Sequence, residues 1–73
     1  MTPTEIKALR KQLGLSQSEM GRLLGLKPEN AGNTVRRWEM DRSIKSHRTP
    51  SGPVVVAMTL IKWFLAHNKR LPL

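Results

Sequence analysis

The sequence predicts an all-α domain, a small bundle of four to five helices. Apolar residues recur at spacings of three and four along most of the chain, without the alternating pattern that is typical of strands. Helix-capping residues and glycines divide this pattern into successive segments. The chain has 73 residues, of which 38% are hydrophobic, so we expect residues 1–73 to form one domain with a modest core.

The first helix is expected to begin at the N-terminus and to end at Gly14. Thr2 can cap it, Pro3 suits the first turn because its missing N–H is not needed there, and Glu5 can complete a capping box. Apolar residues on a single helical face follow, namely Ile6, Leu9 and Leu13. Glycine suits the end of the helix because it adopts the left-handed conformation at no steric cost.

A second, short helix follows, with Ser16 as the N-cap and Glu19 three residues later. Its apolar face consists of Met20, Leu23 and Leu24. Gly25 marks its end. Gly21 in its interior costs about 1 kcal/mol relative to alanine, so we expect another backbone to approach closely at this position.

The third helix is expected to open at Pro28 or Asn30 and to extend to about residue 39. One face carries apolar residues at helical spacing, namely Ala31, Val35 and Trp38. The opposite face carries Asn33, Arg36 and Arg37. Arginines on an exposed face are usually only solvated. Here they lie opposite a core tryptophan on an otherwise amphipathic helix, which indicates a role outside the core.

Residues 40–50 are predicted to form a basic loop, and residues 53–67 a last helix that contributes to the core and to dimerisation. Apolar residues cover an arc of roughly 220° on this helix, whereas a surface helix needs little more than 100°. One stripe is expected to enter the core, namely Val54, Ala57, Met58, Ile61 and Leu65. A second stripe is left for another copy of the chain and consists of Val56, Leu60 and Trp63. Trp63 could alternatively belong to the core.

Composition excludes several kinds of site. The chain has no cysteine, which removes disulfides, thiolate zinc sites and cysteine nucleophiles. His47 and His67 are far apart in sequence, so we expect both to be exposed and no metal to be bound. Neither a nucleophile–base pair, a carboxylate pair nor a glycine-rich phosphate loop is evident. The chain is therefore not expected to be an enzyme, to carry a cofactor or to bind a small molecule.

Charge and hydropathy limit the classes of partner that we expect for the chain. Thirteen Lys and Arg residues against five Asp and Glu residues give a net charge of +8, which indicates a nucleic-acid partner. The N-terminus lacks the uninterrupted apolar segment of a secretory signal. The longest apolar stretch, residues 54–66, is too short to span a bilayer. We therefore expect a cytoplasmic protein without a membrane partner.

Two segments together resemble the helix-turn-helix of the Cro/C1-type (XRE) transcriptional regulators. They are Leu15-Ser16-Gln17-x-x-Met20-Gly21-x-x-Leu24-Gly25-Leu26 and Thr34-Val35-Arg36-Arg37-Trp38-Glu39. The resemblance covers residues 4–42 and implies a lambda-repressor-like fold, in which a small residue at Gly21 lets the recognition helix pack closely. The chain has a few residues more than the usual spacing between Leu26 and Trp38, so either the turn or the recognition helix is longer here. Arg48-Thr49-Pro50, followed by an apolar helix, is more weakly similar to phage anti-CRISPR-associated autorepressors, which bind inverted repeats as dimers.

The resemblance implies that the third helix, about residues 30–39, enters the DNA major groove. Arginine can donate two hydrogen bonds to guanine O6 and N7, and asparagine can pair with adenine N6 and N7. The expected base contacts are Asn33, Arg36 and Arg37, with Arg36 alternatively a phosphate contact. The expected phosphate contacts are Gln17, which resembles the family's phosphate contact, and Lys27, Asn30, Thr34, Arg42 and Lys45. Asn33 could alternatively cap a shortened helix, and Gln17 could contact only water.

The predicted function is that of a sequence-specific regulator of transcription that binds double-stranded DNA. A repressor that binds an inverted repeat as a homodimer fits best, with half-sites about one helical turn, roughly 34 Å, apart. Two alternatives remain open. The chain could be an antitoxin that binds a toxin through its last helix and also represses its own genes, or a basic adaptor that binds RNA or protein.

Overall fold

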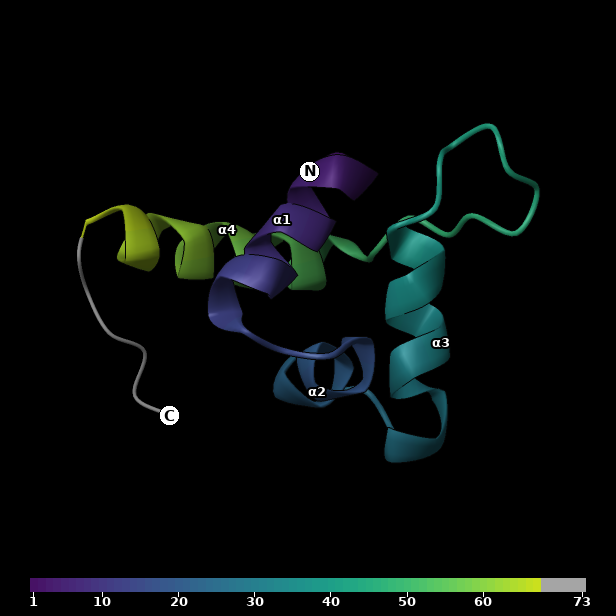
Figure 1. The fold of residues 1–73 in the computed structure, drawn as a ribbon, viewed down its shortest axis with the longest axis horizontal. Coiled ribbons are helices and arrows are strands. Elements are labelled where there is room, and N and C mark those ends of the chain that lie inside the picture. Colours follow the sequence, from purple (N-terminus) through teal and green to yellow (C-terminus); the bar gives the residue numbers. More distant parts are fainter. Residues whose placement is uncertain (68–73) are drawn as a thin grey trace.

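A computed structural model describes residues 1–67 of the protein, which form helices and contain no strand. The helices are α1 (Pro3–Leu13), α2 (Gln17–Leu23), α3 (Pro28–Trp38) and α4 (Gly52–Ala66). Figure 1 shows α3 upright at one edge of the bundle, α2 beside it, and α4 running across α1. The predicted all-α bundle is confirmed, with four helices in the described part.

The N-terminal caps form as the sequence predicts. In α1, the Thr2 side chain accepts a hydrogen bond from the Glu5 backbone N–H at 3.1 Å, and the Glu5 carboxylate accepts one from the Thr2 N–H at 2.9 Å. Ser16 and Glu19 form the same reciprocal pair at the start of α2, at 3.1 and 2.9 Å. Gly14 ends α1 with a φ of 71°, in the left-handed region.

The start of α3 settles two alternatives left open by the sequence. Pro28 occupies the first turn and Lys27 is the N-cap residue. Asn33 therefore lies inside the helix, and the interpretation that it caps a shortened helix is wrong. The turn between α2 and α3 is short, so the residues around 28–33 lengthen the helix and not the turn.

The core lies where α1, α2, α3 and α4 meet. Its buried residues are Ile6, Leu9, Met20, Ala31, Val35, Trp38 and Met58. The predicted close approach at Gly21 is confirmed, because a Cβ added there would lie 2.6 Å from the Cβ of Ala31 and 2.8 Å from its Cα. A glycine is thus required where α2 crosses α3, and this contact fixes how closely the two helices pack.

Residues 39–51 connect α3 to α4 as an irregular segment that contains turns. The Asp41 carboxylate accepts hydrogen bonds from the Ser43 N–H at 2.8 Å and from its hydroxyl at 2.7 Å. His47 is half-buried, with Nδ1 3.0 Å from the Met40 carbonyl oxygen and Nε2 3.3 Å from the Thr49 hydroxyl. The expectation that His47 is exposed is wrong, because its ring contacts two other residues of this loop. His67 is exposed as predicted.

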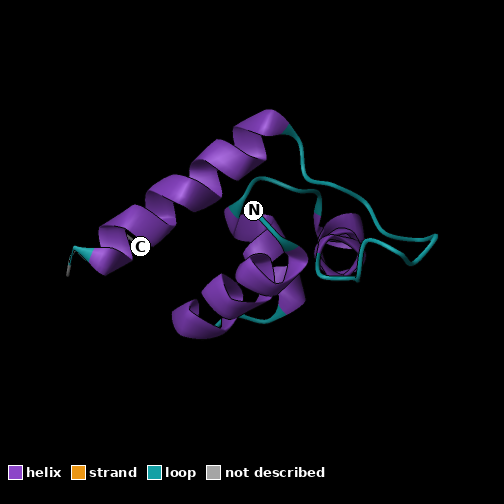
Figure 2. Ribbon diagram, turned by 90° about the horizontal axis from the view of Figure 1, so that it is seen from above, coloured by secondary structure: helices purple, strands orange, loops and turns teal. Residues whose placement is uncertain are grey.

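Helix α4 packs against α1 on one side only, as the view in Figure 2 makes clear. Met58 is fully buried, and Val54, Ile61 and Leu65 pack around the core. An exposed ion pair at 3.3 Å joins Lys62 to Glu5 of α1. None of the helices within residues 1–67 has the length and apolar character that crossing a bilayer would require.

Candidate nucleic-acid interface

Helix α3 divides into a buried face and an exposed polar face. Ala31, Val35 and Trp38 are at most 3% exposed and point into the core. Asn33 and Arg36, on the opposite side, are exposed. Helix α3 stands at one edge of the bundle (Figure 1), and the exposure of Asn33 and Arg36 shows that no other helix covers these two side chains.

Asn33 and Arg36, one turn apart on the exposed face, bond to each other. The Oδ1 atom of Asn33 accepts a hydrogen bond from Arg36 Nη2 at 2.8 Å and a second from Arg36 Nε at 3.3 Å. Glu29, an exposed carboxylate in the first turn of α3, lies one turn before Asn33 on the same face. Sequence reasoning named Asn33 and Arg36 but missed their pairing and the acidic neighbour, although both follow from three- and four-residue spacing.

Arg37 lies on a different flank of α3 from Arg36. The residue is half-buried, and its Nε is buried without a hydrogen-bond partner within residues 1–67. Its carbonyl oxygen accepts a hydrogen bond from the Arg48 N–H at 3.3 Å, which ties this flank of α3 to the following loop. Thr34 is also half-buried. The structure therefore separates the predicted base contacts into an exposed pair, Asn33 and Arg36, and a partly covered Arg37.

Gln17 belongs to a hydrogen-bonded network that sequence reasoning missed. Arg10 donates two hydrogen bonds to the Glu39 carboxylate, from Nε at 2.7 Å and from Nη2 at 3.0 Å. Gln17 Nε2 donates a third to the same carboxylate, at 3.3 Å. The Arg10 and Glu39 side chains are only 14% and 5% exposed. The three residues of this network lie in α1, in α2 and just after α3. Their spacing in the sequence therefore does not predict that they meet.

The network fixes the start of α2 against the end of α3. The hydrogen bonds that Arg10 donates to Glu39, and then the negative charge of Glu39, raise the pKa of Arg10 above its ordinary value despite partial burial. Arg10 also donates to the Leu15 carbonyl oxygen at 3.1 Å, just before α2. One amide N–H of Gln17 therefore points at Glu39. Gln17 is held in place and is not an isolated side chain in water, although its predicted phosphate contact stays a prediction.

Two adjoining hollows lie beside this network, between α1 and the end of α3. The smaller one, about 290 Å³, is lined by Lys7, Arg10, Gln17, Arg36, Glu39 and Met40. The larger one, about 520 Å³, is lined by Pro3, Thr4, Lys7, Glu39, Asp41 and Arg42. Lys7 lines both hollows and is exposed, but no local pattern in the sequence indicates that it belongs to the site. Its position beside Gln17 and Arg36 extends the basic surface onto α1.

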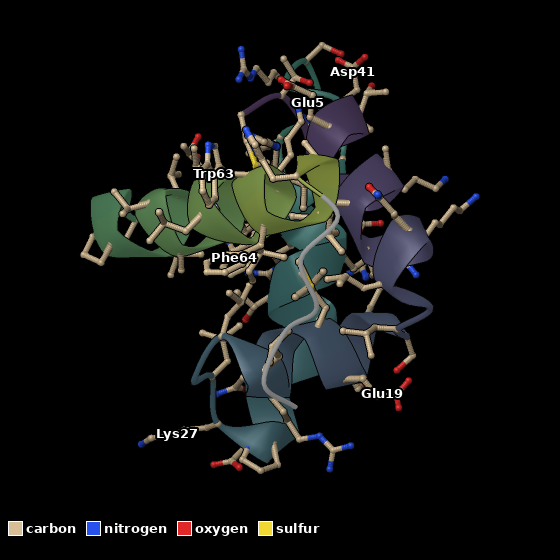
Figure 3. The ribbon with its side chains drawn as sticks, turned by 90° about the vertical axis from the view of Figure 1, so that its left-hand side faces the viewer. Glu5, Glu19, Lys27, Asp41, Trp63 and Phe64 are labelled. Atoms are coloured by element: carbon tan, nitrogen blue, oxygen red, sulfur yellow. The ribbon has the colours of Figure 1, made fainter. Side chains whose placement is uncertain are left out.

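The remaining predicted phosphate contacts lie toward the two ends of α3. Lys27 and Asn30 are exposed at its start, and Arg42 and Lys45 are exposed in the loop that follows it. In Figure 3, Lys27 and Asp41 mark opposite ends of the molecule. Arg42 donates a hydrogen bond to the Met1 carbonyl oxygen at 3.3 Å. Cations at both ends suit a partner with regularly spaced charges, such as a nucleic-acid backbone.

Among the described residues, four of the five exposed large hydrophobic side chains lie on α4. Val56, Leu60 and Trp63 are 59%, 55% and 50% exposed. Sequence reasoning assigned this stripe correctly as separate from the core, but it left Phe64 unplaced. Phe64 is also exposed, and its ring packs edge-on against Trp63 with centroids 5.5 Å apart. Figure 3 shows both rings on α4, outside the body of the bundle.

Comparisons were made with protein families, with curated proteins and with solved structures. Within residues 1–67, no group of three or more His, Asp or Glu side chains is arranged to hold a metal ion. No family model, curated protein or solved structure matches the chain. The features that bear on function are therefore the chemistry of α3, its basic surroundings and the exposed face of α4.

Proposed function

We propose that this chain is a helix-turn-helix regulator of transcription that binds double-stranded DNA in a sequence-specific way, as a repressor of the Cro/C1 type. One observation carries the proposal. Helix α3 buries Val35 and Trp38 in the core and presents Asn33 and Arg36 to solvent from the edge of the molecule. The side chains of α3 that pack in the core are thus separate from those that a ligand can contact.

The DNA major groove suits such a helix. It is wide enough to admit one α-helix, and its base edges display a different pattern of donors and acceptors for each base pair. The net charge of +8 attracts a polyanion. Gln17, Lys27, Arg42 and Lys45 surround α3 and supply contacts to phosphates, which set the position of the helix without reading sequence. Affinity should accordingly fall steeply with salt concentration.

The exposed stripe of α4 supplies the dimer contact in this proposal. Val56, Leu60 and Trp63 form a contiguous apolar surface on a 15-residue helix, and a second copy of the same helix is a matching apolar partner. Two-fold symmetry then presents one α3 to each half of an inverted repeat. A toxin-like partner could occupy the same stripe in an antitoxin that also represses. Sedimentation of the purified chain alone separates these two functions, because a homodimer needs no second protein.

Selection from randomised duplexes, followed by affinity measurement on the selected and on random DNA, tests the proposal. We expect an inverted-repeat consensus for the wild-type chain. Arg37→Ala should cost about 1–3 kcal/mol on the selected site and little on random duplex. Arg22→Ala removes the same charge from the far end of α2 and serves as the control.

Three results would count against parts of this proposal. Equal losses on both duplexes would reassign Arg37 to the phosphate contacts. Stronger competition by single-stranded RNA than by duplex DNA would favour the RNA-binding adaptor. The absence of any duplex binding at low salt would refute DNA binding altogether. Circular dichroism of Arg37→Ala verifies that the variant is folded, since part of this side chain is buried.

A further inference from the structure

We infer that Asn33 and Arg36 read DNA as one unit that only donates hydrogen bonds, and that this unit selects guanine. The inference rests on the proposed binding of α3 in the major groove and specifies what the helix recognises there. Taken singly, an asparagine favours adenine, because adenine offers one acceptor and one donor to its amide. The pairing seen in the structure changes that expectation.

The chemistry of the pair determines the orientation of the asparagine amide. Arginine has only donors, so the Asn33 atom that faces it is the amide oxygen. Arg36 directs two N–H groups at this oxygen, from Nη2 at 2.8 Å and from Nε at 3.3 Å. A carbonyl oxygen accepts two hydrogen bonds, so the acceptor capacity of Asn33 is filled within the protein. What remains for a ligand is the Asn33 Nδ2 amide and the outer N–H groups of Arg36, all of them donors.

Base edges differ in how well they fit a group of donors. Guanine presents two acceptors in the major groove, N7 and O6. Adenine presents N7 as an acceptor beside the N6 amino donor, which would be opposed by another donor and left unpaired. An unpaired polar group buried at an interface costs free energy, so the mismatch penalises adenine as well as failing to reward it. Guanine is therefore the base that satisfies the unit.

Phosphate oxygens are also acceptors and would be the competing ligand. Glu29 argues against them, because this exposed carboxylate lies one turn before Asn33 on the same face of α3. A negative charge at this position repels a charged phosphate more than it repels the neutral edge of a base. The row formed by Glu29, Asn33 and Arg36 is consequently better suited to the groove floor than to the DNA backbone.

A specificity switch tests the inference. Duplexes selected by the wild-type chain should carry guanine at the base pair read by this unit, favoured over adenine by about tenfold or more. Arg36→Met removes the donors that occupy Asn33 Oδ1 and so restores an acceptor. At the same base pair, the preference of this variant should shift toward adenine, with the guanine-to-adenine affinity ratio falling about tenfold.

Two further variants make the result specific. Arg22→Met removes an equal charge from the end of α2 and should leave the base preference unchanged. Asn33→Ala retains Arg36 and should keep guanine with weaker binding. The inference is overturned if the wild-type chain selects adenine there, if it binds duplexes without any base preference, or if Arg36→Met loses affinity equally on selected and random DNA. In each of these outcomes DNA binding itself still stands, whereas a wild-type chain that ignores duplexes removes both proposals.

Discussion

Helices α3 and α4 each bury one face and leave the other uncovered, but the uncovered faces differ in chemistry. The outer face of α3 carries Asn33 and Arg36, which water solvates well. The outer face of α4 carries Val56, Leu60 and Trp63, which water solvates poorly. The first face can remain exposed until a ligand arrives. The second gains free energy from any apolar cover, at roughly 25 cal/mol for each Å² removed from water.

The two helices also differ in how firmly they are attached. Helix α3 meets α2 at the close contact between Gly21 and Ala31 and is further tied by the Arg10–Glu39 pair. Helix α4 meets α1 through Met58 and its partly buried neighbours and through an exposed ion pair. Surface ion pairs contribute little stability. The two long-range contacts of α3 and the one-sided attachment of α4 fit the roles proposed above, DNA recognition for α3 and dimerisation for α4.

The largest effect is expected from a charge placed in the apolar stripe of α4. Leu60→Glu removes an exposed leucine that a second copy would bury and puts a carboxylate in its place, so self-association should weaken by about 100-fold or more. Analytical ultracentrifugation over a range of concentrations measures this change. Thr59→Glu adds the same charge at the neighbouring exposed position, outside the stripe, and should remain dimeric. A Leu60→Glu variant that dimerises as well as the wild-type chain would exclude this surface.

A smaller effect is expected where α2 crosses α3. Gly21→Ala places a methyl group 2.6 Å from the Ala31 Cβ, which forces the two helices apart. We expect the free energy of unfolding to fall by about 1–3 kcal/mol, measured by urea denaturation at fixed protein concentration. Gly52→Ala is the control, since a Cβ there meets no atom within 4 Å. Unchanged stability in Gly21→Ala would show that the packing of α3 is less rigid than we infer.

The smallest effect on stability is expected at Glu5, which lies where α1 meets α4. Hydrogen bonds from Thr2, and then from Lys62, lower the pKa of Glu5 from 4.5 to about 2. A carboxylate whose pKa is lower in the folded state stabilises the fold above its unfolded pKa. That contribution should be lost as the pH falls from 4.5 toward about 2.

Unfolding curves measured across this pH range test the effect of Glu5. Glu5→Gln should show a shallower loss of stability on acidification than the wild-type chain. Glu29→Gln, which removes one exposed carboxylate from the first turn of α3, is the variant matched in charge. Parallel curves for Glu5→Gln and the wild-type chain would show that the Glu5 carboxylate, bonded to Thr2 and paired with Lys62, adds no stability that depends on pH.

Local patterns predicted most of the helical framework. The caps at Thr2 and Ser16 and the stop at Gly14 depend on residues within three or four positions, so the sequence contains all that they need. The same is true of the exposed stripe of α4, which follows from helical periodicity. Gly21 allowed a long-range contact to be predicted. A glycine inside a helix lowers its stability, and this indicated that another backbone packs closely there.

Long-range contacts and loop geometry could not be predicted in the same way. Arg10 and Glu39 are 29 residues apart, and their pairing depends on how α1 meets the end of α3. His47 was expected in solvent because nothing nearby in sequence marks the Met40 carbonyl oxygen as its partner. The Asn33–Arg36 bond is different, since its three-residue spacing is visible in the sequence although the pairing itself was not predicted.

The buried and the outward residues of α3 are separate, which has a consequence for changing the proposed DNA specificity. Asn33 and Arg36 make no contact that the core requires, whereas Ala31, Val35 and Trp38 make many. On the proposed function, substitutions confined to these two outward positions should therefore yield domains with different base preferences on one unchanged scaffold. Such a compact frame, free of cysteine, would be convenient for engineered switches in gene circuits.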